Sequence, residues 1–105
     1  MQASSTSNNK QKIFLKLITN KIKSIKEKNI KNEITKYEIN ISSDIEFKIV
    51  DKLKVYKFRV DVTGSYNVSN QYSQTLNNEK QLIKTLTEKI LNQILEDLTS
   101  KLNDL

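Results

Sequence analysis

Two long segments in the middle of the chain alternate between apolar and polar residues. The first segment places on one face Tyr37, Ile39, Ile41, Ser43, Ile45, Phe47 and Ile49. The second places on one face Tyr56, Phe58, Val60, Val62, Gly64, Tyr66 and Val68. A period of two is typical of a strand with one buried face. We therefore predict a long antiparallel hairpin that turns near Asp51.

The last part of the chain changes to the period of a helix. Its apolar residues recur every three or four positions, which places them on one stripe. They are Leu82, Ile83, Leu86, Ile90, Leu91, Ile94, Leu95, Leu98, Leu102 and Leu105. The pattern predicts a helix from about Asn78 to Asn103, after a polar connection at residues 70–75. Asn77 or Asn78 is the expected N-cap, and Glu79 falls in the first turn.

Residues 12–26 fit two different periods. Ile13, Leu15 and Leu17 alternate with lysines as in a strand, whereas the other apolar residues are spaced as on a helix face. Those other residues are Phe14, Ile18, Ile22 and Ile25. We favour a strand, because β-branched isoleucine is frequent and no cap or stop signal brackets a helix. A polar turn at residues 26–33 then leads into the hairpin.

Together these elements predict a single α+β domain over residues 11–105, in the order β-β-β-α. An apolar sheet face and an apolar helix stripe are each unstable alone in water. We therefore expect two layers, in which one long C-terminal helix packs along the hairpin and the N-terminal strand. Residues 1–10 are polar and low in complexity, and we expect them to form a disordered leader.

The composition excludes several kinds of chemistry. The 105 residues include no Cys and no His, which excludes disulfides, the usual zinc sites and Ser-His or Cys-His dyads. A single glycine, Gly64, excludes a glycine-rich phosphate loop. Nothing in the sequence brings the carboxylates of Glu96 and Asp97, or of Glu46 and Asp61, into a pocket. We expect no enzyme, no catalytic residue, no metal and no cofactor.

No apolar run is long enough to span a membrane, and the first ten residues lack the features of a signal peptide, so we expect the chain as given to be soluble. The tyrosines Tyr37, Tyr56 and Tyr66 are in phase with the apolar face. They are therefore expected to pack in the core rather than to stack on bases.

The net charge of +6 indicates either an anionic partner or ordinary solvated lysines. Basic residues gather near the hairpin turn and in the preceding loop, where they are expected to form one basic end of the molecule. They are Lys26, Lys28, Lys31, Lys48, Lys54, Lys57 and Arg59. The alternative is that those on the polar sheet face form cross-strand ion pairs with Glu46 and Asp61. Both interpretations stay open.

The order of elements and several local sequences resemble the C-terminal part of the lipopolysaccharide-assembly lipoprotein (LptE) family. The features are Thr-Lys-Tyr-Glu-Ile at residues 35–39, Ser65-Tyr66 at the end of the second arm, and the helix sequence of residues 78–95. In that family a tyrosine opens the same long strand, and the last helix carries a segment that corresponds here to Gln93, Ile94 and Leu95. The resemblance covers roughly residues 11–105.

The resemblance implies a non-enzymatic subunit at the periplasmic face of the outer membrane, lipid-anchored in its full-length form. It would plug or support the β-barrel that translocates lipopolysaccharide, and bind lipopolysaccharide phosphates through basic residues. The positions implied are Lys28, Lys31, Lys48, Lys54, Lys57 and Arg59. The family begins with a signal peptide, a lipid-bearing Cys and a further strand-helix unit, so the resemblance implies that the chain as given is truncated.

The alternative function is a small basic nucleic-acid-binding module, which rests on the charge of +6 alone. The polar sheet face lacks the aromatic residues that usually stack on bases, so we expect no nucleic-acid partner. A helix about 10 Å wide covers only part of a three-stranded sheet. We therefore expect an exposed apolar patch and an unpaired strand edge, through which the chain self-associates or is held by another protein.

Overall fold

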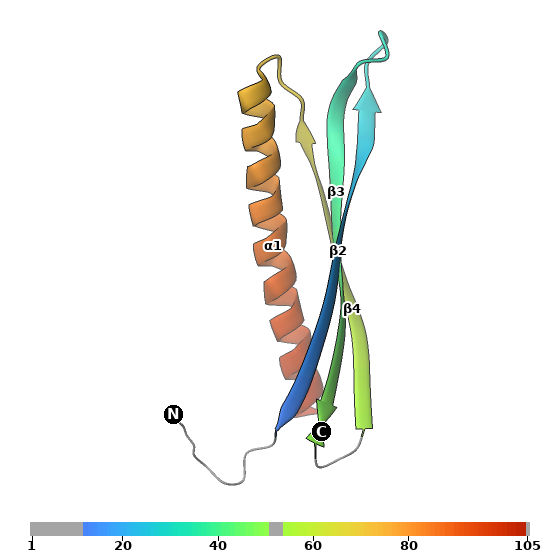
Figure 1. The fold of residues 1–105 in the computed structure, drawn as a ribbon, viewed down its shortest axis with the longest axis vertical. Helices are drawn as coiled ribbons and strands as arrows, with labels where there is room; N and C mark the ends of the chain where they lie inside the picture. The colour runs from blue at the N-terminus through green and yellow to red at the C-terminus, as the bar shows by residue number, and fades with distance from the viewer. Residues whose placement is uncertain (1–11, 51–53, 105) are drawn as a thin grey trace.

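The computed structural model describes residues 12–50 and 54–104. It contains strands β2 (Ile13–Lys28), β3 (Ile34–Ile49) and β4 (Lys54–Asn67), followed by helix α1 (Tyr72–Asn103) (Figure 1). The predicted α+β class and the element order β-β-β-α are confirmed. The expected leader at residues 1–10 and the hairpin turn near Asp51 lie outside the described residues.

The three strands form one antiparallel sheet in the order β2-β3-β4. β2 pairs with β3 from Ile13 opposite Ile49 to Lys28 opposite Ile34, so residues 12–26 belong to a strand and not to a helix. In the second pairing, Ile49 lies opposite Lys54 and Lys36 lies opposite Asn67. The alternation of β3 and β4 therefore brings the two predicted apolar faces onto the same side of the sheet.

Helix α1 covers that apolar face and packs on β4 and β3. The core joins residues of both strands to one stripe of the helix. Its buried residues are Ile39, Ile41, Ile45, Val60, Val62, Tyr66, Leu86, Ile90 and Ile94. Ser43 is also buried on this face, where its hydroxyl lies 3.0 Å from the hydroxyl of Thr19 on β2. The hydrogen bond satisfies both polar groups.

Gly64 marks a close approach between β4 and α1. A Cβ atom at this position would lie 2.7 Å from Cδ1 of Leu82 and 3.4 Å from Cδ2 of Leu86. The absence of a side chain lets the helix lie directly against the strand, which is one of the uses of glycine inside a strand.

The helix begins earlier than predicted, at Tyr72 rather than Asn78. Gln71 is the N-cap and makes no side-chain capping bond, and Glu79 lies beyond the first turn. The predicted N-cap therefore is wrong. Instead, the amide of Asn78 donates to the carbonyl of Asn67, and the backbone N–H of Ser69 donates to the hydroxyl of Thr75. These side chains connect the first turns of the helix to the end of β4. Most of the polar segment at residues 70–75, which was predicted as a connection, therefore belongs to the helix.

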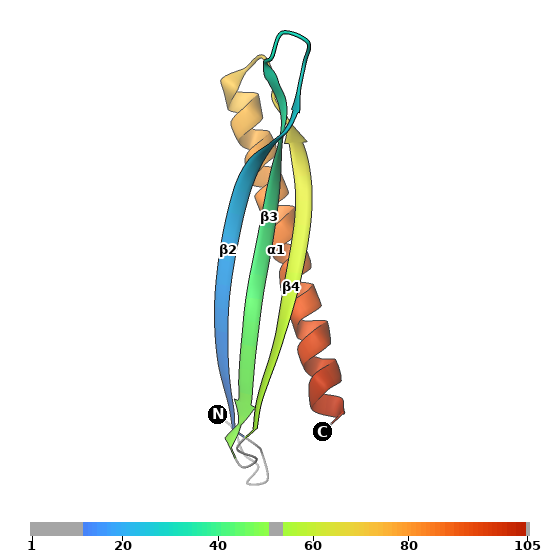
Figure 2. The ribbon, with the colours of Figure 1, turned by 90° about the vertical axis from the view of Figure 1, so that its right-hand side faces the viewer.

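The molecule is elongated, with principal dimensions of 64 × 27 × 18 Å. Figure 2 shows α1 crossing behind the sheet at an angle, so that its C-terminal half lies on the β4 side, away from β2. Every residue of β2 is exposed. The helix thus covers two strands and leaves the third open.

Candidate binding surfaces

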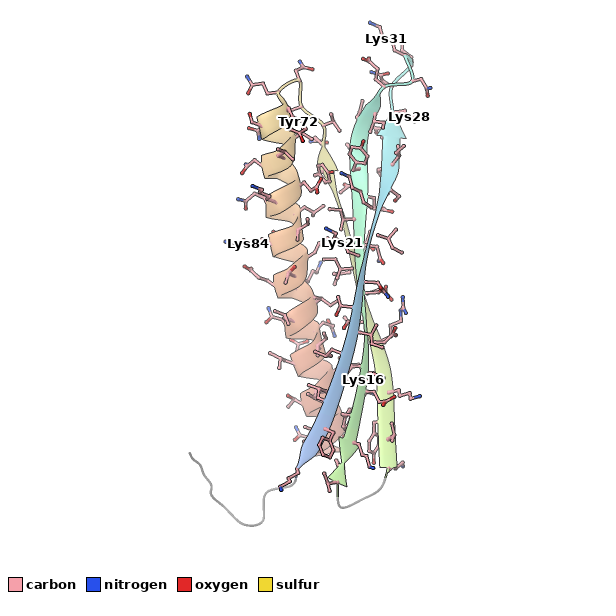
Figure 3. All side chains as sticks on the ribbon, in the orientation of Figure 1. Lys16, Lys21, Lys28, Lys31, Tyr72 and Lys84 are labelled. Carbon is pink, nitrogen blue, oxygen red and sulfur yellow. The ribbon has the colours of Figure 1, made fainter. Side chains whose placement is uncertain are left out.

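The predicted basic residues lie at two opposite ends of the molecule. Lys28 ends β2 and Lys31 follows in the turn to β3 (Figure 3). Lys48 and Lys54 lie at the far end of β3 and β4. The 16 residues of β3 separate the two groups by about 50 Å. The expected single basic end is therefore wrong, because antiparallel pairing places the two connections of β3 at its opposite ends.

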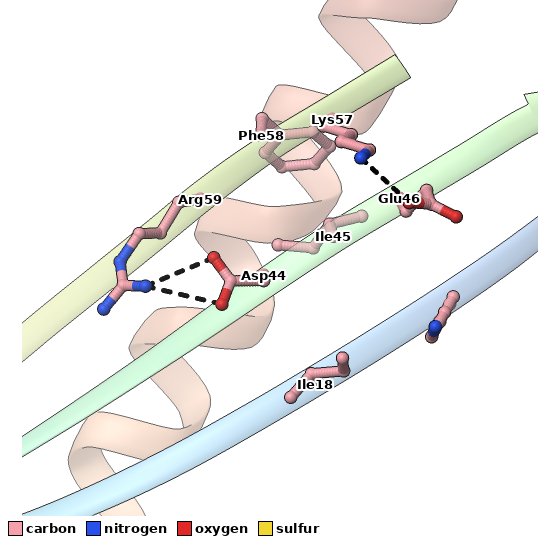
Figure 4. Close-up of a pocket in the computed structure, with 8 residues that line it drawn as sticks. Ile18, Asp44, Ile45, Glu46, Lys57, Phe58 and Arg59 are labelled. Carbon is pink, nitrogen blue, oxygen red and sulfur yellow. Dashed lines mark hydrogen bonds and ion pairs between the residues drawn. The ribbon is translucent and has the colours of Figure 1, made fainter. Parts of the chain in front are cut away.

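Lys57 and Arg59 lie on the polar face of the sheet, where both form cross-strand ion pairs (Figure 4). The ammonium nitrogen of Lys57 is 3.6 Å from Oε1 of Glu46. The guanidinium of Arg59 lies 3.2 Å from Oδ1 of Asp44 and 3.0 Å from Oδ2 of Asp61. Asp61 first, and then Asp44, raise the pKa of Arg59. The expected cross-strand pair with Glu46 is confirmed. Asp61 also forms an ion pair, but with Arg59 of its own strand, and the cross-strand partner of Arg59 is Asp44.

A shallow depression of about 400 Å³ lies beside these ion pairs. Its lining includes Lys16 and Ile18 of β2. Lys16 stands opposite Glu46 in the strand register but forms no ion pair with any residue in the described ranges. The depression therefore combines the apolar Ile18 and Lys16, which is unpaired among the described residues, with the ion-paired charges of β3 and β4.

The other predicted basic residues are in mixed surroundings. Lys54 lies on the helix side of the sheet, with its ammonium 5.2 Å from the ring centroid of Tyr56, a cation–π distance. Within residues 12–50 and 54–104, Lys28, Lys31 and Lys48 form no ion pair. The structure therefore does not bring the six predicted residues together as one site.

A cluster that the sequence analysis missed joins β2 to α1. Glu79 accepts hydrogen bonds from the ammonium of Lys23 at 2.9 Å and from the hydroxyl of Tyr66 at 2.6 Å. The same ammonium lies 4.4 Å above the ring centroid of Tyr37, and the rings of Tyr37 and Tyr66 stack at 5.7 Å. Extending the strand alternation through residue 23 would have placed this lysine on the helix side.

The hydrogen bonds of this cluster shift the pKa values of its members in consistent directions. The hydroxyl of Tyr66 and then Lys23 hold the pKa of Glu79 below its usual value. Tyr66 and then Glu79 raise the pKa of Lys23, and burial raises the pKa of Tyr66. All three groups keep their ordinary charge at neutral pH. Together with Tyr72 of the helix, the cluster lines a pocket of about 310 Å³. Through the contact of Lys23 with Glu79, it also connects the C-terminal half of β2 to α1.

The part of β2 from Ile13 to Ile22 carries apolar side chains on both faces. By register, Ile13, Leu15 and Leu17 lie on the helix side, opposite Ile49, Phe47 and Ile45. On the polar side lie Phe14, Ile18 and Ile22. Phe14 is 67% exposed and Ile18 is 50% exposed. Because α1 packs on the other two strands, neither face of this part of the strand is covered. We call these six residues the β2 surface.

One flank of α1 adds to the open apolar area. Lys89, Gln93 and Asp97 line a depression with residues of β4, so that flank borders the β4 edge. At 3.6 residues per turn, Leu91 and Leu95 lie on the opposite flank of the helix. Their exposed fractions are 52% and 60%. Apolar area is therefore left open on the helix side of the molecule as well as on β2.

Comparisons with models of known protein families and with curated protein sequences find no match for the chain. In the part of the chain that the structure describes, no helix is long and apolar enough to cross a membrane. The same residues hold no cluster of three or more acidic, His or Cys side chains that is arranged to bind a metal.

Proposed function

We propose that this protein is a non-enzymatic assembly subunit of the lipopolysaccharide-assembly lipoprotein type, at the periplasmic face of the outer membrane. The observation that carries the proposal is the β2 surface together with the open flank of α1. An exposed apolar strand edge of this size is typical of a surface that another protein covers. The expected partner is the β-barrel that translocates lipopolysaccharide.

The resemblance and the geometry support each other at the open side of the sheet. In the resembled family a further strand and helix cover the part of the sheet that one helix leaves bare. Here the bare part is β2, on the side away from the C-terminal half of α1. Three of the residues that carry the resemblance also have structural roles, since Tyr37 stacks on Tyr66 and Ile94 is buried in the core.

The geometry favours the loop lysines for contact with lipopolysaccharide phosphates. Lys28 and Lys31 are exposed at the tip between β2 and β3 and form no ion pair with a described residue. Contact at Lys57 or Arg59 would require a phosphate to displace a carboxylate partner. Ammonium groups bind phosphate as point charges, so these two exposed lysines at one tip of the sheet are a suitable minimal site.

The direct test is binding of fluorescent lipopolysaccharide to the purified protein. We expect the double variant Lys28→Glu/Lys31→Glu to bind about tenfold more weakly, and its circular dichroism to be unchanged because both side chains are exposed. The matched control is Lys80→Glu/Lys84→Glu, which makes the same change of charge on the outer face of α1. An equal loss of lipopolysaccharide binding in both variants would show that binding depends on the net charge of the protein and not on a site at Lys28 and Lys31.

The second test concerns the β-barrel partner. Site-specific crosslinkers at Phe14 and Ile18 should capture the barrel in outer-membrane extracts, whereas a crosslinker at Lys89, on the flank of α1 that borders β4, should not. Lipopolysaccharide that does not bind the wild-type protein, together with crosslinking that captures no barrel, would refute the proposed function.

A further inference from the structure

The outer edge of β2 is an open strand edge along its whole length. β2 pairs with β3 only, and the sheet order leaves its other side without a strand among the described residues. In an antiparallel pair, about half of the backbone N–H and C=O groups of an edge strand point away from the sheet. These groups form a ready template for another extended chain.

The opposite edge of the sheet is protected in a way that β2 lacks. α1 covers one face of β4, and the other face carries the ion-paired side chains of Lys57, Arg59 and Asp61. Cover by a helix is one of the ways in which proteins protect an edge strand. β2 also carries charged side chains, but neither of its faces is covered and it presents the apolar β2 surface, so its edge is the one suited to docking.

The charges of β2 indicate the chemistry of the docking partner. The strand contains five lysines and one glutamate. Lys23 and Lys26 are paired with Glu79 and Glu38. Lys16, Lys21 and Lys28 form no ion pair within the described ranges; Figure 3 labels all three along the strand. A partner that lies beside them gains by carrying carboxylates at the facing positions.

We infer that β2 binds an extended segment of a partner protein, which adds a fourth strand to the sheet. The segment is apolar beside residues 13–18, apart from a carboxylate that faces Lys16, and acidic beside residues 21–28. Backbone hydrogen bonds supply the affinity of such strand addition, and facing side chains supply its specificity. The inference rests on the proposed function only in assigning the segment to an assembly partner.

A second copy of this chain fits the edge less well. Two antiparallel β2 strands bring ten lysines and two glutamates together. In the register that pairs Lys21 with its own copy, Lys16 also faces Lys26 of the other strand. Like charges placed opposite each other destabilise strand pairs. Charge complementarity therefore favours an acidic segment over self-pairing.

The test uses the whole chain and a synthetic peptide as long as β2. At the end designed to lie beside residues 13–18, the peptide carries valine at every position except the one that faces Lys16. Glutamates occupy the positions that face Lys16, Lys21 and Lys28. A control peptide carries lysine in place of each glutamate. In calorimetry, we expect the acidic peptide to bind at least tenfold more tightly than the basic one, and its binding to protect the outward-pointing amides of β2 from hydrogen exchange.

Protein variants then locate the effect on β2. Lys16→Glu/Lys21→Glu should abolish or reverse the preference between the two peptides, whereas Lys80→Glu/Lys84→Glu should preserve it. Absence of binding, or protection on α1 instead of β2, would overturn the inference. Self-association that protects the same outward-pointing amides of β2 from hydrogen exchange would also overturn it, since the occupant of the edge would then be a second copy. Neither lipopolysaccharide nor a β-barrel enters this assay, so its outcome is independent of the function tests.

Discussion

At the scale of single residues, the packing of β4 against α1 depends on the missing side chain of Gly64. A methyl group there meets Cδ1 of Leu82 at 2.7 Å, so the leucine must change its rotamer or the helix must shift. The contact is with the end of a flexible side chain. The adjustment is therefore local, and its cost falls at the low end of the range for overpacked cores.

Gly64→Ala should lower the free energy of unfolding by about 1 kcal/mol, because overpacking outweighs the usual gain from replacing glycine in a strand. Urea unfolding followed by circular dichroism measures the change. In the Leu82→Ala background the methyl group has space, so the same substitution should cost little or even stabilise. Equal costs in the two backgrounds would show that the contact with Leu82 is not the cause.

Glu79 should make the stability of the protein sensitive to acid. Its folded-state pKa is lowered, so its contribution is present above the usual pKa of 4.5 and is lost as the pH falls through the lowered value. Glu79→Gln should reduce stability at pH 7 by about 1 kcal/mol, since the ammonium of Lys23 is partly exposed to solvent. The difference between variant and wild type should shrink below about pH 4. Thermal unfolding from pH 3 to 7 tests this; a constant difference would contradict it.

At the scale of elements, the start of α1 depends on two side chains outside the usual capping position. Thr75→Ala removes the acceptor of the Ser69 N–H, and Asn78→Ala removes the donor to the carbonyl of Asn67. Each substitution should cost about 1 kcal/mol and increase amide exchange at residues 72–78. Gln74→Ala is the control, because its bond to Asn78 is exposed and stays within the helix. Fraying equal to that of the control would argue against these ties.

The predictability of each element follows from how many of its faces are covered. β3 and β4 were predicted because α1 buries one face of each strand while the other face meets solvent, so apolar and polar residues alternate in their sequences. β2 was ambiguous because neither face is covered, and apolar residues such as Phe14 and Ile18 occur between the members of the strand series. The helix start was missed because Gln71 makes no capping bond and therefore leaves no sequence signal.

The candidate site was less predictable than the fold. The partners of Lys57 and Arg59 follow from strand register alone, which the hairpin pattern provides. The cluster of Lys23 and Glu79 depends on where α1 crosses the sheet, and a one-dimensional pattern does not contain a crossing angle. The prediction of a single basic end was wrong because Lys31 and Lys48 lie at opposite ends of the long strand β3.

At the scale of the whole molecule, the open apolar area should be visible in solution. The wild-type protein should bind a hydrophobic dye and show concentration-dependent light scattering. Phe14→Thr/Ile18→Thr should reduce both signals and change the free energy of unfolding by less than about 0.5 kcal/mol, because both side chains are already exposed. Low dye binding by the wild type, with a stable monomer at high concentration, would show that the chain closes its own surface.

Each element of this fold contacts mainly the element next to it in the chain, from β2 to β3, then β4, then α1. β2 is therefore held by its ladder with β3, by the hydrogen bond between Thr19 and Ser43 and by the ion pair between Lys23 and Glu79. We expect β2 to open locally while the core beneath the helix stays closed, because such subglobal opening has a lower free energy than complete unfolding. A molecule that binds β2 should then raise the stability of this strand to that of the β3-β4-α1 unit.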